Sequence, residues 1–261
     1  MLMRRMTKFM LSIVLIGSLL FYPVPHTATA KKTDASYPFI KNPIVSDIDV
    51  LIDVGHGGVD SGTLHGNILE KDINLKMAQI TYKLLKEKGL TAMVNRLDDY
   101  ALSEENRWLR IRSRHLKDLA QRSHLANEIR PKAMISLHVN WSGKSSKRGP
   151  LVLFQNTDSS KQLAEHIQRS LNELYGTSTE AVYGKPYYLL KHVKVPAVIV
   201  EMGFISNQAD RDQMMQPEKQ KQLAEAIVKG VSAYLESTGS MKKKESSGSY
   251  FRYFNKLRKL F

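Results

Sequence analysis

Short apolar runs alternate with longer amphipathic segments along most of the chain. The runs predict strands at residues 50–54, 90–95, 132–137, 151–154 and 197–200, with a further short strand at 187–190. Apolar positions at helical spacing predict helices over residues 70–89, 103–127, 158–174 and 217–235. Most strand runs are continuous rather than alternating, which is typical of strands buried on both faces. The pattern therefore predicts an α/β sandwich with a largely parallel central sheet.

The N-terminal segment has the pattern of an export signal. Arg4, Arg5 and Lys8 precede an apolar run over residues 9–22, and Ala28 and Ala30 provide the small residues before a cleavage point. The run is shorter than the roughly 20 residues that a membrane-spanning helix needs, which favours a cleaved signal peptide. The alternative is that the segment is retained as a membrane anchor. We predict a signal peptide at 1–30, a proline-containing linker at 31–46 and one folded domain at 47–238.

Composition restricts the partners and the metal chemistry. The formal net charge is +14, which suits an anionic partner such as nucleic acid, lipid or a wall polymer. Export removes nucleic acid from this set, and leaves the cell wall or the outer face of the cytoplasmic membrane as the location. Cysteine is absent from the sequence, so metal ligands must be His, Asp or Glu.

The C-terminal tail, residues 239–261, combines aromatic and basic residues. Its last segment, YFRYFNKLRKLF, would as a helix place aromatic and leucine side chains opposite Arg252, Lys256 and Lys259. We predict that this tail binds an anionic lipid surface or wall polymer. The alternative is a helix that packs on the catalytic domain.

Three potential functional residues follow apolar strand runs. His56, His138 and Glu201 each come one to three residues after such a run, and Glu70 lies on the connection that leaves the first of them. In open α/β sheets the functional side chains gather beyond the carboxyl ends of parallel strands. Two histidines and a carboxylate around an open position are the usual ligands of a hydrolytic zinc centre. Glu201 is the candidate acid/base outside the metal's coordination sphere.

Each assignment has a competing interpretation. The GHGG turn around His56 could bind a phosphate, although it lacks the nucleotide-binding glycine motifs. Glu201 could be a buried carboxylate that pairs with Arg96 or Lys191. His65 competes with Glu70 in the same loop, and Asp53 is a possible hydrogen-bond partner of a ligand histidine.

Four blocks in the chain carry a family resemblance: LIDVGHGGVDSG, LEKDINL, ANEIRPKAMISLHVN and PAVIVEMGFISN. In this order they resemble the zinc-dependent N-acetylmuramoyl-L-alanine amidases of bacteria and phages. The resemblance implies that His56, Glu70 and His138 bind Zn²⁺ and that Glu201 is the catalytic acid/base. It also implies a mixed, mostly parallel six-stranded sheet flanked by helices.

The implied function is a secreted peptidoglycan hydrolase, which we expect to be a monomer. It would cleave the amide between N-acetylmuramic acid and L-alanine of the stem peptide. The segment 139–150 is too short for the blocking helix of autoinhibited members, so we expect an open groove. The alternatives are a zinc exopeptidase that acts on wall peptides and a wall-binding protein without activity.

Overall fold

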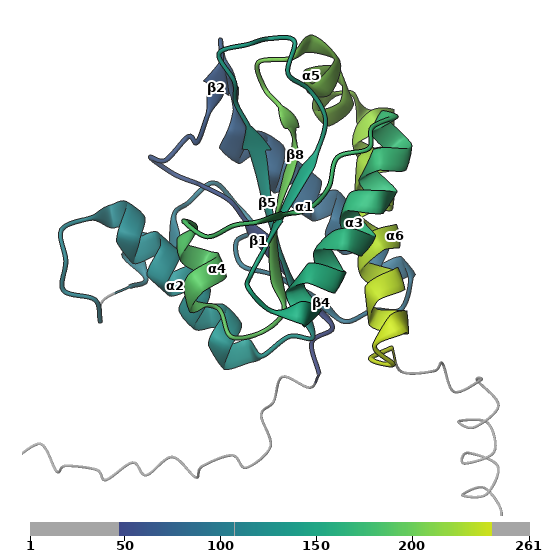
Figure 1. Cartoon of the computed structure of the whole chain (residues 1–261). Coiled ribbons are helices and arrows are strands. Elements are labelled where there is room, and N and C mark those ends of the chain that lie inside the picture. The colour runs from purple at the N-terminus through teal and green to yellow at the C-terminus, as the bar shows by residue number, and fades with distance from the viewer. Residues whose placement is uncertain (1–46, 107, 242–261) are drawn as a thin grey trace, which may run out of the picture. The chain divides into compact units, whose positions relative to one another are not determined.

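The computed structural model describes residues 47–106 and 108–241 (Figure 1). The predicted signal peptide (1–30), the linker (31–46) and residues 242–261 of the predicted tail lie outside the described residues. Their assignments therefore stay predictions.

The domain is built on a six-stranded sheet with the order β4-β1-β5-β8-β6-β7. The first four strands run parallel to one another, β6 is antiparallel to β8, and β7 is parallel to β6. A two-stranded ribbon of β2 and β3 lies apart from this sheet. The strands are β1 (Val50–Val54), β2 (Leu64–His65), β3 (Ile68–Leu69), β4 (Ala92–Val94), β5 (Ala133–Asn140), β6 (Leu151–Phe154), β7 (Val182–Tyr183) and β8 (Ala197–Phe204). The predicted mixed, mostly parallel six-stranded sheet is confirmed.

Helices cover both faces of the sheet. They are α1 (Glu70–Glu87), the 3₁₀ turn η1 (Leu102–Glu104), α2 (Arg114–Ile129), α3 (Asp158–Tyr175), α4 (Tyr188–His192), α5 (Gln208–Met215) and α6 (Pro217–Ser237). Figure 1 shows α3 and α6 on one side of the sheet and α2 and α4 on the other. Within the described residues, every helix is too short or too polar to cross a membrane.

Side-chain alternation along the strands separates two cores. Val50, Ile52 and Val54 of β1 pack with apolar residues of α1, α3 and α6. Leu51, between them, packs instead with residues of α2 and α4. Successive side chains of a strand point to opposite faces, so Asp53 shares the face of Leu51. The same alternation in β5 and β8 puts Ser136, His138 and Glu201 on the side of α2 and α4, because Met134 and Ile199 belong to that core.

The start of one predicted helix and one predicted strand were wrong. The helix predicted over 103–127 begins only at Arg114, where the Ser113 side chain accepts a hydrogen bond from the Leu116 amide and caps it. Asn106 closes an irregular loop before it by binding the Leu109 amide and the Lys117 carbonyl. The strand predicted at 187–190 is part of α4, a case in which a short apolar run does not separate strand from buried helix.

Two predicted site residues lie inside strands rather than after them. β5 continues through His138 to Asn140, with a register shift between these two residues. β8 continues through Glu201 to Phe204. His138 and Glu201 are direct register partners in the parallel β5–β8 pair, so their side chains leave the same face of the sheet next to each other.

Candidate metal centre

His56 lies just beyond the end of β1 in a tight turn. Its backbone is left-handed, with φ 61°, an uncommon conformation for a residue other than glycine. Nδ1 of His56 lies 2.9 Å from Asp60 Oδ2. A hydrogen bond from Nδ1 to this carboxylate leaves Nε2 as the free donor atom for a metal. The same hydrogen bond from His56 lowers the pKa of Asp60 to about 2.

The glycine turn does not offer its amides to a phosphate. The Gly57 amide donates to the Asp60 carbonyl, the Gly58 amide to Asp99 Oδ1 and the Gly62 amide to Asp60 Oδ1. An anion cradle needs free amides directed at the ligand. The phosphate interpretation of this turn is therefore wrong.

Glu70 is the first residue of α1 and is buried. Its Oε2 accepts a hydrogen bond from the Thr63 amide at 2.8 Å, and its Oε1 accepts one from the Val139 amide at 3.0 Å. Burial alone would raise the pKa of Glu70, but the two neighbouring histidines outweigh burial and lower it. The side chain is therefore held as a carboxylate in one orientation.

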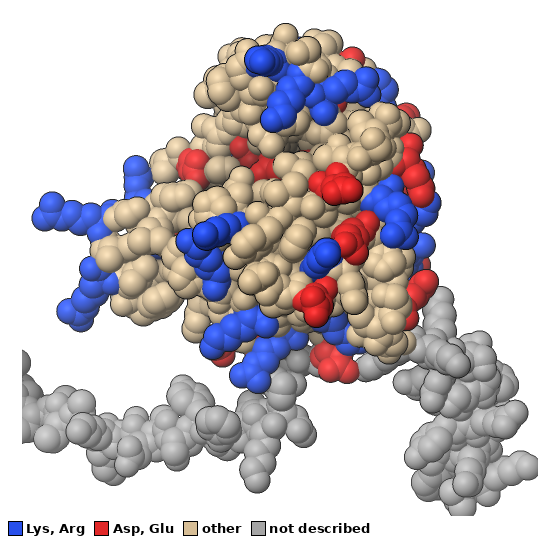
Figure 2. Space-filling model, viewed as in Figure 1, with Lys and Arg blue, Asp and Glu red and all other residues tan. Residues whose placement is uncertain are grey.

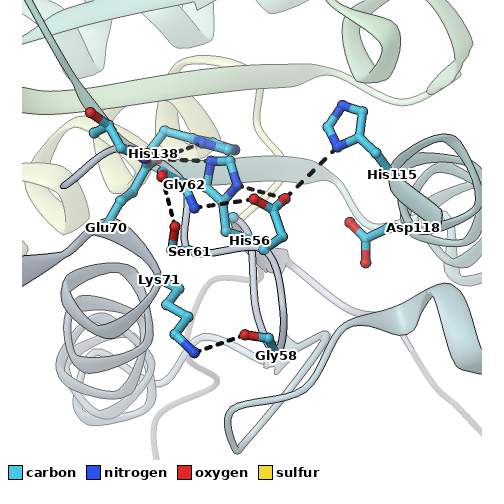
Figure 3. Close-up of polar contacts among 12 residues, drawn as sticks. His56, Gly58, Ser61, Gly62, Glu70, Lys71, His115, Asp118 and His138 are labelled. Carbon is cyan, nitrogen blue, oxygen red and sulfur yellow. Dashed lines mark hydrogen bonds and ion pairs between the residues drawn. The ribbon is translucent and has the colours of Figure 1, made fainter. Parts of the chain in front are cut away.

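The three predicted ligands point at one spot (Figure 3). Glu70 Oε1 lies 3.1 Å from His56 Nε2 and 2.9 Å from His138 Nδ1. One donor atom from each of His56, Glu70 and His138 lies within 4.8 Å of the other two. Two imidazoles and a carboxylate are the donor set of many hydrolytic zinc sites, so the residues present fit a zinc ion.

Two glycines make room for this cluster. A Cβ on Gly55 would overlap the His138 ring, and a Cβ on Gly62 would lie 2.5 Å from Glu70 Oε2 and 2.7 Å from His56 Cδ2. Gly62 also has a positive φ of 64°. Because real Cβ atoms do not approach other atoms so closely, the close approach of the three donors requires glycine at both positions.

A buried polar network supports His138 from behind. Asp53 binds Arg122 through Nε at 2.7 Å and through Nη2, and it accepts hydrogen bonds from Ser136 at 2.6 Å and Asn95 at 2.7 Å. Arg122 Nη2 in turn lies 3.5 Å from His138 Nε2. The predicted contact between Asp53 and a ligand histidine is therefore wrong as stated, because Arg122 lies between them.

Glu201 lies beside the cluster without a polar partner. Within the described residues its carboxylate makes no hydrogen bond or ion pair. Arg96 binds the carbonyls of Gly55 and Lys71 instead, and Lys191 is exposed on α4, so the predicted alternative partners are both wrong. Burial raises the pKa of Glu201 to about 8, and the nearby Glu70 carboxylate adds to the rise. A carboxylate of this kind can hold and release a proton near neutral pH.

The other histidines have different positions. His65 lies on the exposed ribbon strand β2 and is not part of the cluster, so it does not replace Glu70. His115, at the start of α2, has its Nδ1 3.8 Å from Asp60 Oδ2, and Figure 3 shows it on the opposite side of His56 from Glu70 and His138. The strand pattern does not predict this position, because His115 comes from a helix start rather than a strand end.

The cluster opens into a hollow of about 430 Å³. Its walls include Glu201, Trp141 of the β5–β6 loop, and Tyr187 before α4. No helix forms between β5 and β6, as expected for an open groove.

Comparisons with known proteins agree with this geometry. Residues 50–233 match the N-acetylmuramoyl-L-alanine amidase family over more than half of the chain. The chain belongs to this family. It is therefore an N-acetylmuramoyl-L-alanine amidase, an enzyme class of peptidoglycan catabolism, and zinc dependence is general in the family.

Individual relatives support the same assignment. The germination-specific N-acetylmuramoyl-L-alanine amidase of Bacillus subtilis is 31% identical over 197 residues, which cover 73% of this chain and 81% of the relative. The uncharacterized protein YqiI of the same organism is 35% identical over 188 residues, covering 71% and 84%. The structure of the CwlD amidase from Clostridioides difficile, in complex with the GerS lipoprotein, matches with a TM-score of 0.67 and 28% identity, covering 72% and 98%.

Proposed function

We propose that this amidase hydrolyses the amide between the lactyl group of N-acetylmuramic acid and L-alanine with the help of zinc. The observation that carries the proposal is the convergence of His56, Glu70 and His138 in one hollow, next to a buried Glu201 that has no polar partner among the described residues. Zinc held by the three donors would supply a Lewis acid and lower the pKa of coordinated water to roughly 7.

Glu201 performs the proton transfers in this proposal. It accepts a proton from the attacking water as the new C–O bond forms at the lactyl carbonyl carbon. It then returns the proton to the alanine nitrogen as the C–N bond breaks, which gives a free carboxylic acid and a free amine. Glu201 has no salt-bridge partner in the described part of the chain, which suits this role, because a paired carboxylate would be a weaker base.

The surrounding residues hold the ligands in place. Asp60 fixes the His56 ring through Nδ1, and the Thr63 amide fixes Glu70 through Oε2. Such outer contacts set ligand orientation and tautomer in metal sites. The Asp53 and Arg122 pair lies against the opposite edge of the His138 ring, with Arg122 Nη2 3.5 Å from His138 Nε2.

Export and a location at the wall are part of the same proposal. The substrate is peptidoglycan, and relatives include proteins named as probable cell wall amidases. A basic signal-like segment at 1–30 is the sequence feature that supports secretion, and the tail at 239–261 is the proposed contact to anionic wall polymer or membrane. We propose that the chain acts as a monomer.

Product analysis on purified peptidoglycan tests the reaction. The proposal predicts peptide-free glycan and peptides with a new N-terminal L-alanine by mass spectrometry. Peptides shortened from an end would instead identify an exopeptidase, and no soluble product would identify a binding protein.

The Glu201→Gln variant tests the mechanism. Its kcat should fall by about 10²–10⁴-fold, the usual contribution of a general acid/base, while zinc content stays at the wild-type level. Glu128→Gln, on the exposed side of α2, is the matched control and should keep wild-type kcat. Full activity of Glu201→Gln would exclude the proposed role.

A further inference from the structure

Two hollows of different chemistry meet at the metal centre. The larger one, about 430 Å³, extends from the cluster toward Trp141 and Tyr187. The second, about 340 Å³, lies between the glycine turn, η1 and the start of α2. His56 and His115 line both hollows, so a molecule bound across the centre would occupy one hollow on each side.

The larger hollow, which we call the aromatic hollow, has an apolar and aromatic wall. Trp141 is 59% exposed and Tyr187 is 40% exposed, although both are large hydrophobic residues. Of the residues that the structure describes, no lysine or arginine lines this hollow. Exposed aromatic rings offer flat apolar faces with a polar atom at the edge, which suit a ligand with both C–H and hydroxyl groups.

The second hollow, which we call the Arg114 hollow, is lined by Arg114 and by two aspartates, Asp60 and Asp118. Its two aspartates already have partners: Asp60 binds His56, and Asp118 accepts from the Leu102 amide and pairs with Arg122. Arg114 forms no ion pair within the described residues. Arginine stays charged at all relevant pH values and binds carboxylates with two parallel hydrogen bonds.

Arg114 belongs to a wider basic surface. Arg110 and Arg112, on the loop just before α2, are also exposed and have no ion-pair partner within the described part of the chain. Figure 2 shows Lys and Arg side chains that project from the lobe on the left, where Figure 1 places this loop and α2. The positive potential of this surface favours an acidic group at the mouth of the Arg114 hollow.

The two sides of the scissile amide differ in charge, as the two hollows do. On one side is a sugar whose only carboxyl group, on the lactyl arm, is consumed in the amide. On the other side is a peptide that contains glutamate and so keeps a carboxylate. From this correspondence, which rests on the proposed function, we infer that N-acetylmuramic acid lies in the aromatic hollow and the stem peptide in the Arg114 hollow. Arg114 there binds a free carboxylate of the peptide.

Charge removal at Arg114 tests the peptide side. Wild-type protein is assayed on two muropeptides that differ only in whether the glutamate carboxylate is free or amidated. We expect a preference of about tenfold in kcat/KM for the free acid, arising in KM, as for one charge-assisted hydrogen-bonded pair. Arg114→Gln should reduce the ratio to near one, and Arg114→Lys should retain part of it.

Arg110→Gln is the matched control for this experiment, because Arg110 lies on the same basic surface but lines neither hollow. It should lose only a small part of the preference, because Arg110 acts through the long-range potential and not through a direct hydrogen bond. An unchanged preference in Arg114→Gln, or an equal loss in Arg110→Gln, would overturn the assignment of Arg114.

The two tryptophans of the chain test the sugar side. Trp108 is 55% exposed, nearly as much as Trp141, but it contacts Gln121 and lines neither hollow. Trp141→Ala should lower kcat/KM about tenfold on a disaccharide peptide and leave hydrolysis of a sugar-free N-lactoyl peptide unchanged. Trp108→Ala should change neither. Equal losses of Trp141→Ala on both substrates would contradict the orientation.

The inference and the proposed function fail in different ways. If wild-type protein hydrolyses none of these substrates, the proposed function is wrong. If it hydrolyses them all but Arg114→Gln and Trp141→Ala leave both ratios unchanged, the reaction stands and the orientation alone is wrong.

Discussion

The two faces of the central sheet differ in what they bury. The face under α1, α3 and α6 is almost entirely apolar and holds the larger core. The face under α2 and α4 has a smaller apolar core and buries the Asp53–Arg122 pair, with His138 and Glu201 emerging beside it. The same strands supply both faces, because neighbouring residues in a strand point in opposite directions.

This difference separates stability from site geometry. Apolar packing is non-directional, so the larger core stabilises the sheet without fixing any single side chain by hydrogen bonds. A buried ion pair contributes less net stability but fixes the orientation of the groups around it. Leu137 of β5 packs in the larger apolar core, and the next residue, His138, points to the opposite face beside Glu201.

The largest effects are expected from mutating Leu137 and His138, which are neighbours in β5 but point to opposite faces. His138→Ala should reduce amidase activity by about 10³-fold or more, as a lost ligand removes several kcal/mol of transition-state stabilisation, and zinc content should fall with it. Leu137→Ala should lower the free energy of unfolding by about 2–5 kcal/mol through a core cavity, yet retain zinc. Urea denaturation and metal analysis of both variants measure the contrast, which would be lost if Leu137→Ala also released zinc from folded protein.

The second-largest effect is expected from a mutation that breaks the buried Asp53–Arg122 ion pair. Asp53→Asn leaves the buried Arg122 with only its longer contact to Asp118, at 3.4 Å, which should cost about 3 kcal/mol of stability at neutral pH. Burial would raise the pKa of Asp53, but Arg122 outweighs burial and holds it below the usual value. The contribution of Asp53 is therefore present above its unfolded pKa, about 4, and is lost as pH falls through the folded value.

Urea denaturation over a pH series checks this sign. The difference in unfolding free energy between wild type and Asp53→Asn should be largest near neutrality and shrink below about pH 4. A difference that stays constant with pH would mean that the Asp53 charge is not what stabilises this face.

The smallest effect is expected from two glycines of one loop. Gly62 and Gly66 have similar left-handed backbones, with φ of 64° and 58°, but an added Cβ at Gly66 meets nothing within 4 Å. Both alanine variants should lose about 1–2 kcal/mol through backbone strain. Only Gly62→Ala should also weaken zinc binding, by about 10–100-fold, since its Cβ displaces Glu70 and His56. Equal zinc affinities in the two variants would show that the close approach at Gly62 is unimportant.

The sequence predicted the sheet and the convergence of His56, Glu70 and His138, for physical reasons. Continuous apolar runs identify buried parallel strands, and parallel strands bring their functional residues to one region of the sheet. His56, His138 and Glu70 were found in this way, together with the glycine turn that lets them approach. The family resemblance led to the same residues.

The remaining features depend on contacts between distant segments. Asp60 is recognisable as the partner of His56 only when the turn is folded, and Arg122 meets Asp53 across 69 positions of the chain. Asn95 joins β4 to this network by accepting from the Val54 amide and donating to Asp53. Such pairings leave no periodic pattern in the sequence, and neither does the position of His115 beside the groove.

Zinc titration of the chelator-treated full chain by calorimetry tests the central claim most directly. We predict one zinc site per chain in wild-type protein, and loss of this site in His56→Ala, in Glu70→Ala and in His138→Ala, while Glu201→Gln retains it. Zinc binding of wild-type strength in any of the three ligand variants, or no binding by folded wild-type protein, would contradict a shared site.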